Sequence, residues 1–72
     1  MTILFNDVKT KQVFTYTDDV GTSGNFMKID PLEDEECANN IANAVSIDDA
    51  FFPIGSTTHF FNESTVTLLT QH

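Results

Sequence analysis

The sequence predicts a single α+β domain spanning residues 1–72, a small antiparallel sheet of about four strands with one helix packed on it. Three observations predict this fold. Runs rich in β-branched and aromatic residues lie near both ends of the chain. An Asp-Pro pair followed by acidic residues in the middle has the form of a helix N-terminus. The hydrophobic fraction of 40% is enough for a folded core. We therefore expect the order ββαββ.

The first two strands are predicted over residues 2–6 and 12–17. In the second of them Phe14 and Tyr16 share one face and alternate with β-branched residues, which is the pattern of a half-buried strand. The polar residues 7–11 between the two runs predict a hairpin connection. After a glycine-containing loop, residues 25–29 are expected to form a short extended segment that leads to the helix.

The helix is predicted to begin at Asp30, with Asp30 as the N-cap, Pro31 in the first helical position and Glu33 in the third. Apolar residues at helical spacing follow, and asparagines are expected on the outward side. The apolar stripe is Ala38, Ile41, Ala42 and Val45, and the outward residues are Asn39, Asn40 and Asn43. The acids of the first turns suit the positive end of the helix dipole.

The C-terminal part is predicted to hold a second pair of strands. Residues 46–49 repeat a weaker capping pattern and predict one extra turn. Residues 56–61 and 65–70 have the composition of strands, and the intervening residues 62–64 predict a turn between them. The chain is therefore expected to end on a second hairpin.

Charge is the most unusual property of the chain, which carries 11 acidic residues, three Lys and no Arg, for a net charge of -8. The imbalance is confined to residues 29–72, because the acids and lysines of residues 1–28 cancel. Such a charge bears on partners and solubility rather than on fold. We expect a basic protein partner for these carboxylates. The candidate partner-binding residues are Asp30, Glu33, Asp34, Glu35, Glu36, Asp48, Asp49 and Glu63.

The same composition disfavours several other functions. Direct binding of nucleic acid requires cations for the phosphates, and the chain offers three. No run approaches about 18 consecutive apolar residues, and the N-terminus lacks the pattern of a signal peptide, so we expect a cytoplasmic protein without membrane contact. The lone Cys37 excludes an intramolecular disulfide and is expected to be a buried structural thiol.

No catalytic, cofactor or metal site is predicted, and the chain is not expected to be an enzyme. Cys37 and His59 lack the accompanying groups of a nucleophilic site, and a domain this short has little volume for a pocket. A calcium loop starting at Asp19 would have Gly24 and Asp30 at suitable positions, but Gly21 stands where an oxygen ligand is required.

The function predicted is therefore non-enzymatic binding, as an acidic inhibitor or adaptor that docks on a basic protein, including proteins that bind nucleic acid. Glu33 with Glu36, or Asp34 with Asp48, would form a row of carboxylates that mimics a phosphate backbone. Size and charge are those of accessory proteins encoded by viruses and mobile elements. A simpler interpretation is a solvated helix face. The alternative function is self-association into a homodimer or larger assembly, which would stabilise a thin core.

Overall fold

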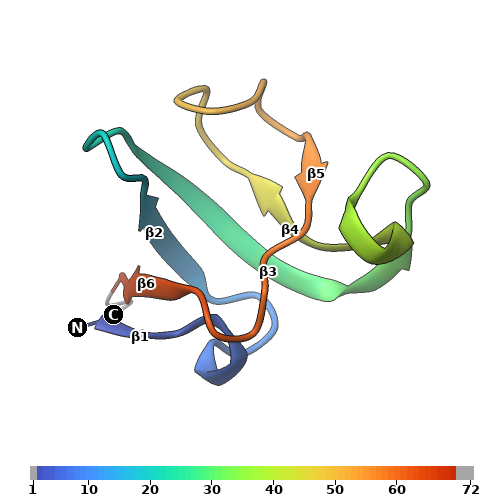
Figure 1. Ribbon diagram of the computed structural model, residues 1–72, viewed down its shortest axis with the longest axis horizontal. Helices are drawn as coiled ribbons and strands as arrows, with labels where there is room; N and C mark the ends of the chain where they lie inside the picture. The colour runs from blue at the N-terminus through green and yellow to red at the C-terminus, as the bar shows by residue number, and fades with distance from the viewer. Residues whose placement is uncertain (1, 70–72) are drawn as a thin grey trace.

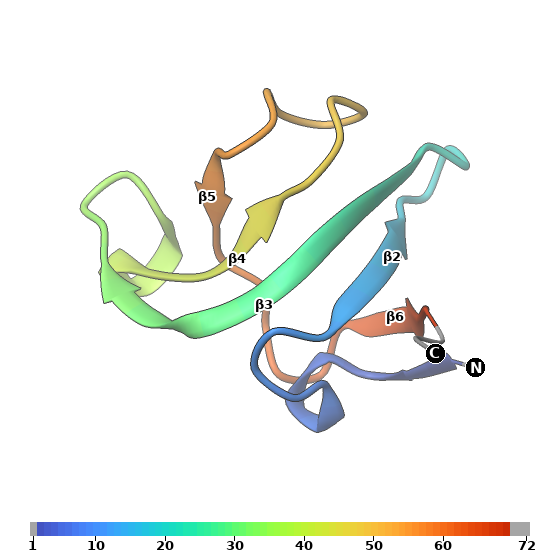
Figure 2. The same cartoon turned by 180° about the vertical axis from the view of Figure 1, so that it is seen from behind.

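The computed structural model describes residues 2–69, apart from the side chain of Ala38, and this part of the chain is almost entirely β structure. Its strands are β1 (Thr2–Leu4), β2 (Val13–Thr17), β3 (Ser23–Glu33), β4 (Ile41–Ser46), β5 (Thr57–Thr58) and β6 (Thr65–Leu68). They form one antiparallel sheet in the order β1-β6-β2-β3-β4-β5 (Figure 1). The long strand β3 bends, with β2, β6 and β1 on one side of it and β4 and β5 on the other (Figure 2).

The predicted helix is wrong, and the fold is all-β rather than α+β. The only helical segments among residues 2–69 are two 3₁₀ turns of three residues, η1 (Phe5–Asp7) and η2 (Ala38–Asn40). Asp30, Pro31 and Glu33, which have the spacing of a helix cap, all lie within β3.

A bulge in β3 accommodates the proline that resembles a helix start. The pairing register between β3 and β4 shifts between Lys28 and Leu32, so that three residues of β3 lie opposite Asn43 of β4. Pro31 is one of these three residues. Proline has no N–H to donate to a strand partner, and it is tolerated in sheets at bulges and open edges. The same residue therefore fits a bulged strand as well as a helix N-terminus.

The asparagines predicted on the outside of the helix form the turn that ends β3. Asn39 and Asn40 both have φ of 58°, in the left-handed region that asparagine adopts more readily than most residues. An α-helix does not continue through two such residues, so the chain reverses. Of the apolar residues whose spacing predicted a helix, Ile41, Ala42 and Val45 lie instead in β4, where Ala42 is completely buried.

Both predicted hairpins are also wrong in their pairing, although Val13–Thr17, within the predicted range 12–17, do form a strand, β2. Strand β6 lies between β1 and β2, with Ile3 opposite Val66 and Phe14 opposite Leu68. Strand β5 has only two residues and pairs with β4. The predicted extra turn over 46–49 is the end of β4 and the start of a loop, and Thr70 of the predicted last strand lies outside the described residues.

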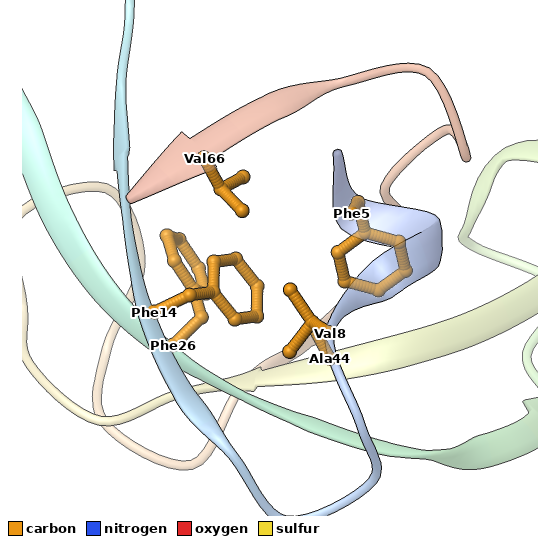
Figure 3. Packing of buried hydrophobic residues seen from close by; sticks show 6 residues of the cluster. All are labelled: Phe5, Val8, Phe14, Phe26, Ala44 and Val66. Atoms are coloured by element: carbon orange, nitrogen blue, oxygen red, sulfur yellow. The ribbon is translucent and has the colours of Figure 1, made fainter. Parts of the chain in front are cut away.

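Aromatic rings from distant parts of the chain form the core. The buried cluster consists of Phe5, Val8, Phe14, Phe26, Ala44 and Val66 (Figure 3). Phe14 lies opposite Phe26 in the β2–β3 pair, and their ring centroids are 5.8 Å apart. Phe60 packs against this cluster from the segment that joins β5 to β6, with its ring 5.0 Å from that of Phe26 and 5.3 Å from that of Phe14. The core therefore depends on where that connecting segment runs.

A side-chain amide fixes the segment that carries Phe60. Asn43 is buried, and its Nδ2 donates to the Phe60 carbonyl at 2.9 Å while its Oδ1 accepts from the Phe60 N–H at 2.8 Å. The amide thus replaces the backbone partner that an adjacent strand would provide. The expectation that Asn43 lies on the outside of a helix is wrong, because the residue is buried in β4.

We predict that Asn43→Ala lowers the free energy of unfolding by about 2–4 kcal/mol, because it leaves two backbone groups of Phe60 without partners in a partly buried place. Chemical denaturation of the purified protein measures this. Asn62→Ala, at an exposed turn, is the matched control and should change stability by less than about 0.5 kcal/mol. Equal midpoints for the two variants would contradict the assigned role of Asn43.

Candidate functional site

Four acidic residues meet at the turn that follows β3, and we call residues 33–36 the acidic loop. Asp34 organises it. Its Oδ1 accepts from the Glu36 N–H at 3.0 Å, and its Oδ2 accepts from the Thr57 hydroxyl of β5 at 2.9 Å. Glu33, Glu35 and Glu36 are exposed. The loop is therefore held against β5 by one carboxylate, while three others face solvent.

The other predicted partner-binding residues lie elsewhere. Asp30 is exposed in the β3 bulge and accepts from the Thr10 hydroxyl at 3.2 Å. Asp48 accepts from the backbone N–H groups of Asn25 and Ala50, at 2.9 and 3.1 Å, so it is used to shape the loop after β4. Asp49 and Glu63 are exposed in two separate connections.

The structure thus brings together only the residues of the acidic loop. Asp34 and Asp48 do not form a row, because Asp48 contacts Asn25 near the start of β3 whereas Asp34 follows its end.

The lysines leave the acidic loop without an opposite charge. The Lys28 ammonium points inward, where it donates to the carbonyl oxygens of Phe5 and Val8 at 3.2 and 2.6 Å and lies 4.6 Å from the centroid of the Phe5 ring. Lys9 and Lys11 belong to the connection between η1 and β2. The hydrogen bonds that the Asp34 carboxylate accepts come from uncharged groups, namely a backbone N–H, the Thr57 hydroxyl and the Cys37 thiol, so they do not neutralise the negative charge of the loop.

A groove lined by aromatic side chains lies beside the acidic loop. Its apolar part has a volume of about 260 Å³ and is lined mainly by Tyr16, Phe26, Phe51, Phe52, Phe60 and Phe61. A second, more polar cavity of about 670 Å³ shares lining residues with it and reaches Asp34, Glu36 and Cys37. Phe52, Thr58 and His59 line both parts, so we treat them as one feature and call it the aromatic groove. In both overall views the loop that joins β3 to β4 lies beside β5 (Figures 1 and 2).

Sequence reasoning missed the aromatic groove, although two Phe doublets signal it. In Phe51-Phe52 and Phe60-Phe61 the first ring is partly buried against the core, whereas the second is 43% exposed in Phe52 and 57% exposed in Phe61. Neighbouring residues of an extended chain point to opposite sides, so such a doublet buries one ring and exposes the other.

Gly24 allows the wall of the groove to form. A Cβ at this position would lie 2.5 Å from a ring carbon of Phe51, so only glycine lets that ring lie directly on β3. Phe51 then packs beside Tyr16, with ring centroids 5.8 Å apart. The wall is therefore built from β2, β3 and the loop after β4.

Cys37 and His59 each lie against a backbone carbonyl oxygen, with Cys37 Sγ 4.0 Å from that of Thr57. His59 Nδ1 lies 3.0 Å from the Ile41 carbonyl, which can only accept, so Nδ1 carries a proton and donates. Desolvation, followed by the hydrogen bond and the charge of Asp34, raises the pKa of the Cys37 thiol above its usual value of 9.0. Among the described residues no cluster of three His, Cys, Asp or Glu side chains suits a metal ion. No helix in residues 2–69 has the length and apolar character needed to cross a membrane.

Comparison of the chain with protein-family models, with curated proteins and with solved structures gives no significant match.

Hydrogen bonds from the Glu36 N–H and then the Thr57 hydroxyl lower the pKa of Asp34 below its usual value of 3.8. A carboxyl whose pKa is depressed by folding stabilises the fold above its unfolded-state pKa and loses that effect as pH falls through its folded-state pKa. At neutral pH Asp34 is thus ionised, and it disfavours a thiolate at Cys37.

We predict that Asp34→Asn increases the rate at which iodoacetamide alkylates Cys37, because removing the nearby charge lowers the pKa of the thiol. Mass spectrometry of alkylation between about pH 7 and 10 measures the midpoint of the rate profile. Glu35→Gln is the matched control, since it removes the same charge from the same loop at a residue that does not contribute to the shift. A midpoint that moves equally in both variants would contradict the assignment to Asp34.

Proposed function

We propose that the protein is a non-enzymatic binding protein, an acidic inhibitor or adaptor that docks on a basic surface of another protein. The observation that carries the proposal is the acidic loop, in which Glu33, Glu35 and Glu36 face solvent without a neighbouring lysine to pair with. Charge of one sign concentrated on a projecting hairpin steers association with a partner of opposite sign.

The hairpin is suited to docking because its conformation is fixed before binding. The Asp34 carboxylate ties the acidic loop to Thr57, and the Asn40 carbonyl accepts from the Asp34 N–H at 2.9 Å. A preorganised loop loses little conformational entropy when it binds. Basic grooves of nucleic-acid-binding proteins are one class of surface with the required charge, and on such a groove the loop would act as a nucleic-acid mimic.

No catalytic step belongs to the proposal. The raised pKa of the Cys37 thiol and the hydrogen bond from His59 Nδ1 to a backbone carbonyl disfavour a thiolate–imidazole pair, which supports a non-enzymatic role. We place the binding in the cytoplasm, where the free thiol of Cys37 would stay reduced.

Self-association is the second candidate function, and the edge strand β1 favours it. Within residues 2–69, β1 pairs with β6 on one side and with no strand on the other. Leu4 of this strand is 45% exposed. An open edge with an exposed apolar residue is a template for pairing with a second copy.

For the main proposal, we predict that changing Glu33, Glu35 and Glu36 to Gln weakens binding of an octa-arginine peptide roughly tenfold at about 50 mM salt. Asp34 is kept because it is structural. Changing Asp7, Asp19 and Asp49 to Asn removes the same charge from exposed residues outside the loop and is the matched control. Isothermal titration at about 50 and 250 mM salt measures both affinities. Equal losses in the two variants would mean that only net charge matters and would contradict docking through the loop.

For the second candidate, we predict a dimer at tens of micromolar that persists at about 1 M salt, because apolar and backbone contacts are not screened. Leu4→Lys should abolish it, whereas Val20→Lys, which changes an exposed residue away from the sheet edges, should not. Sedimentation equilibrium measures the mass. A mass of 8.0 kDa for the unchanged protein under all conditions would exclude this candidate.

A further inference from the structure

The aromatic groove has an apolar end that is open in the folded protein. Phe61 is 57% exposed although its ring lies against that of His59, with centroids 5.1 Å apart. The inner wall of this end is formed by Tyr16, Phe51 and Phe60. The Tyr16 ring packs against the rings of both phenylalanines. A volume of about 260 Å³ is below the range of about 300–1,000 Å³ for drug-sized ligands, so it suits one large side chain.

The other end of the groove presents hydrogen-bond acceptors. Asp34 and Glu36 contribute carboxylates. The His59 ring lines the same end, and its Nδ1 lies 3.0 Å from the Ile41 carbonyl oxygen. Acceptors of this kind match a guanidinium or ammonium group, which has only donors, and a guanidinium can bond a carboxylate through two N–H groups.

We infer that the aromatic groove binds an extended segment of the basic partner, with an aromatic or large aliphatic side chain in the apolar end and an Arg or Lys side chain at Asp34 and Glu36. This inference rests on the proposed function and names the part of the partner that is recognised. Charge complementarity selects the occupant. A second copy of this chain, with a net charge of -8, and a nucleic acid would both bring negative charge to the acidic end.

The two ends have separate tasks in this arrangement. The carboxylates attract basic segments in general, and the rings discriminate among them, because an aromatic side chain gains from stacking and from removal of apolar surface from water. A basic segment without a large apolar residue should therefore bind through the acidic loop alone.

Three peptides separate these contributions when added to the full chain labelled with ¹⁵N. The aromatic basic peptide is acetyl-Trp-Gly-Arg-Gly-Arg-amide, the basic peptide has Ala in place of Trp, and the aromatic neutral peptide has Gln in place of both Arg. We expect the aromatic basic peptide to bind roughly tenfold more tightly than either of the others. Its amide shift changes should extend from the acidic loop to Phe52, His59 and Phe61, whereas those of the basic peptide should be confined to the loop.

Phe61→Ser tests the apolar end, and Val20→Ser is its control, since Val20 is 86% exposed and does not line the groove. Phe61→Ser should reduce binding of the aromatic basic peptide to the level of the basic peptide, while Val20→Ser should leave it unchanged. Thermal unfolding of both variants verifies that the fold is retained.

Each other outcome overturns the inference in a recognisable way. Equal affinities for the aromatic basic and basic peptides, with shifts in the loop only, would leave the proposed function standing without the groove. Equal affinities for the two aromatic peptides would remove the role of the carboxylates. Absence of shifts with every peptide would overturn the proposed function as well. Shifts of groove residues on dilution without peptide would identify a second copy as the occupant.

Discussion

The structure depends on the pair of hydrogen bonds between the Asn43 amide and the backbone of Phe60. β5 is two residues long, so backbone pairing alone secures little of the chain that leads from β5 to β6. The buried amide takes over that role and directs the Phe60 ring into the core, where its centroid lies 5.4 Å from that of Phe5. Once Phe60 points inward, Phe61 must point outward. Core packing and exposure of the groove therefore follow from one contact.

The sequence predicted the strand around Phe14 because its alternation is local, and it failed where partners are distant. Pro31 resembles a helix start, yet it lies in a bulge that becomes apparent only when β4 is placed beside β3. Ala42, Asn43 and Ala44 are all buried, so β4 lacks the alternation of apolar and polar residues that identifies a half-exposed strand. Three consecutive buried residues are compatible with either a helix or a strand. The asparagines at positions 39 and 40 are the remaining local signal, because they favour left-handed turns over helices.

Composition indicates where negative charge is concentrated but not which carboxylates act together. The acidic loop is contiguous in sequence, so its residues had to be neighbours in any fold. Because β4 runs antiparallel to β3, Asp48 lies after β4 at the opposite end of the pair from the acidic loop. Its carboxylate oxygens accept hydrogen bonds from backbone N–H groups. The aromatic groove combines residues from β2, β3, β5 and two loops, and no short-range sequence pattern predicts that these residues lie together. Only the Phe doublets indicate, from sequence, that some rings must remain exposed.

The acidic residues on β3 have a structural use that those beyond its end do not share. Over residues 29–33 no strand within the described part of the chain pairs with β3 on the side away from β4. Charged residues, proline and bulges at such an edge oppose pairing with other chains. Asp30 and Glu33 provide the charge, and Pro31 lies in the bulge. Glu35 and Glu36 follow the strand and protect no edge. Their charge therefore has no role in pairing of the sheet, and Glu36 lines the polar part of the groove, which supports the proposal that the loop serves binding.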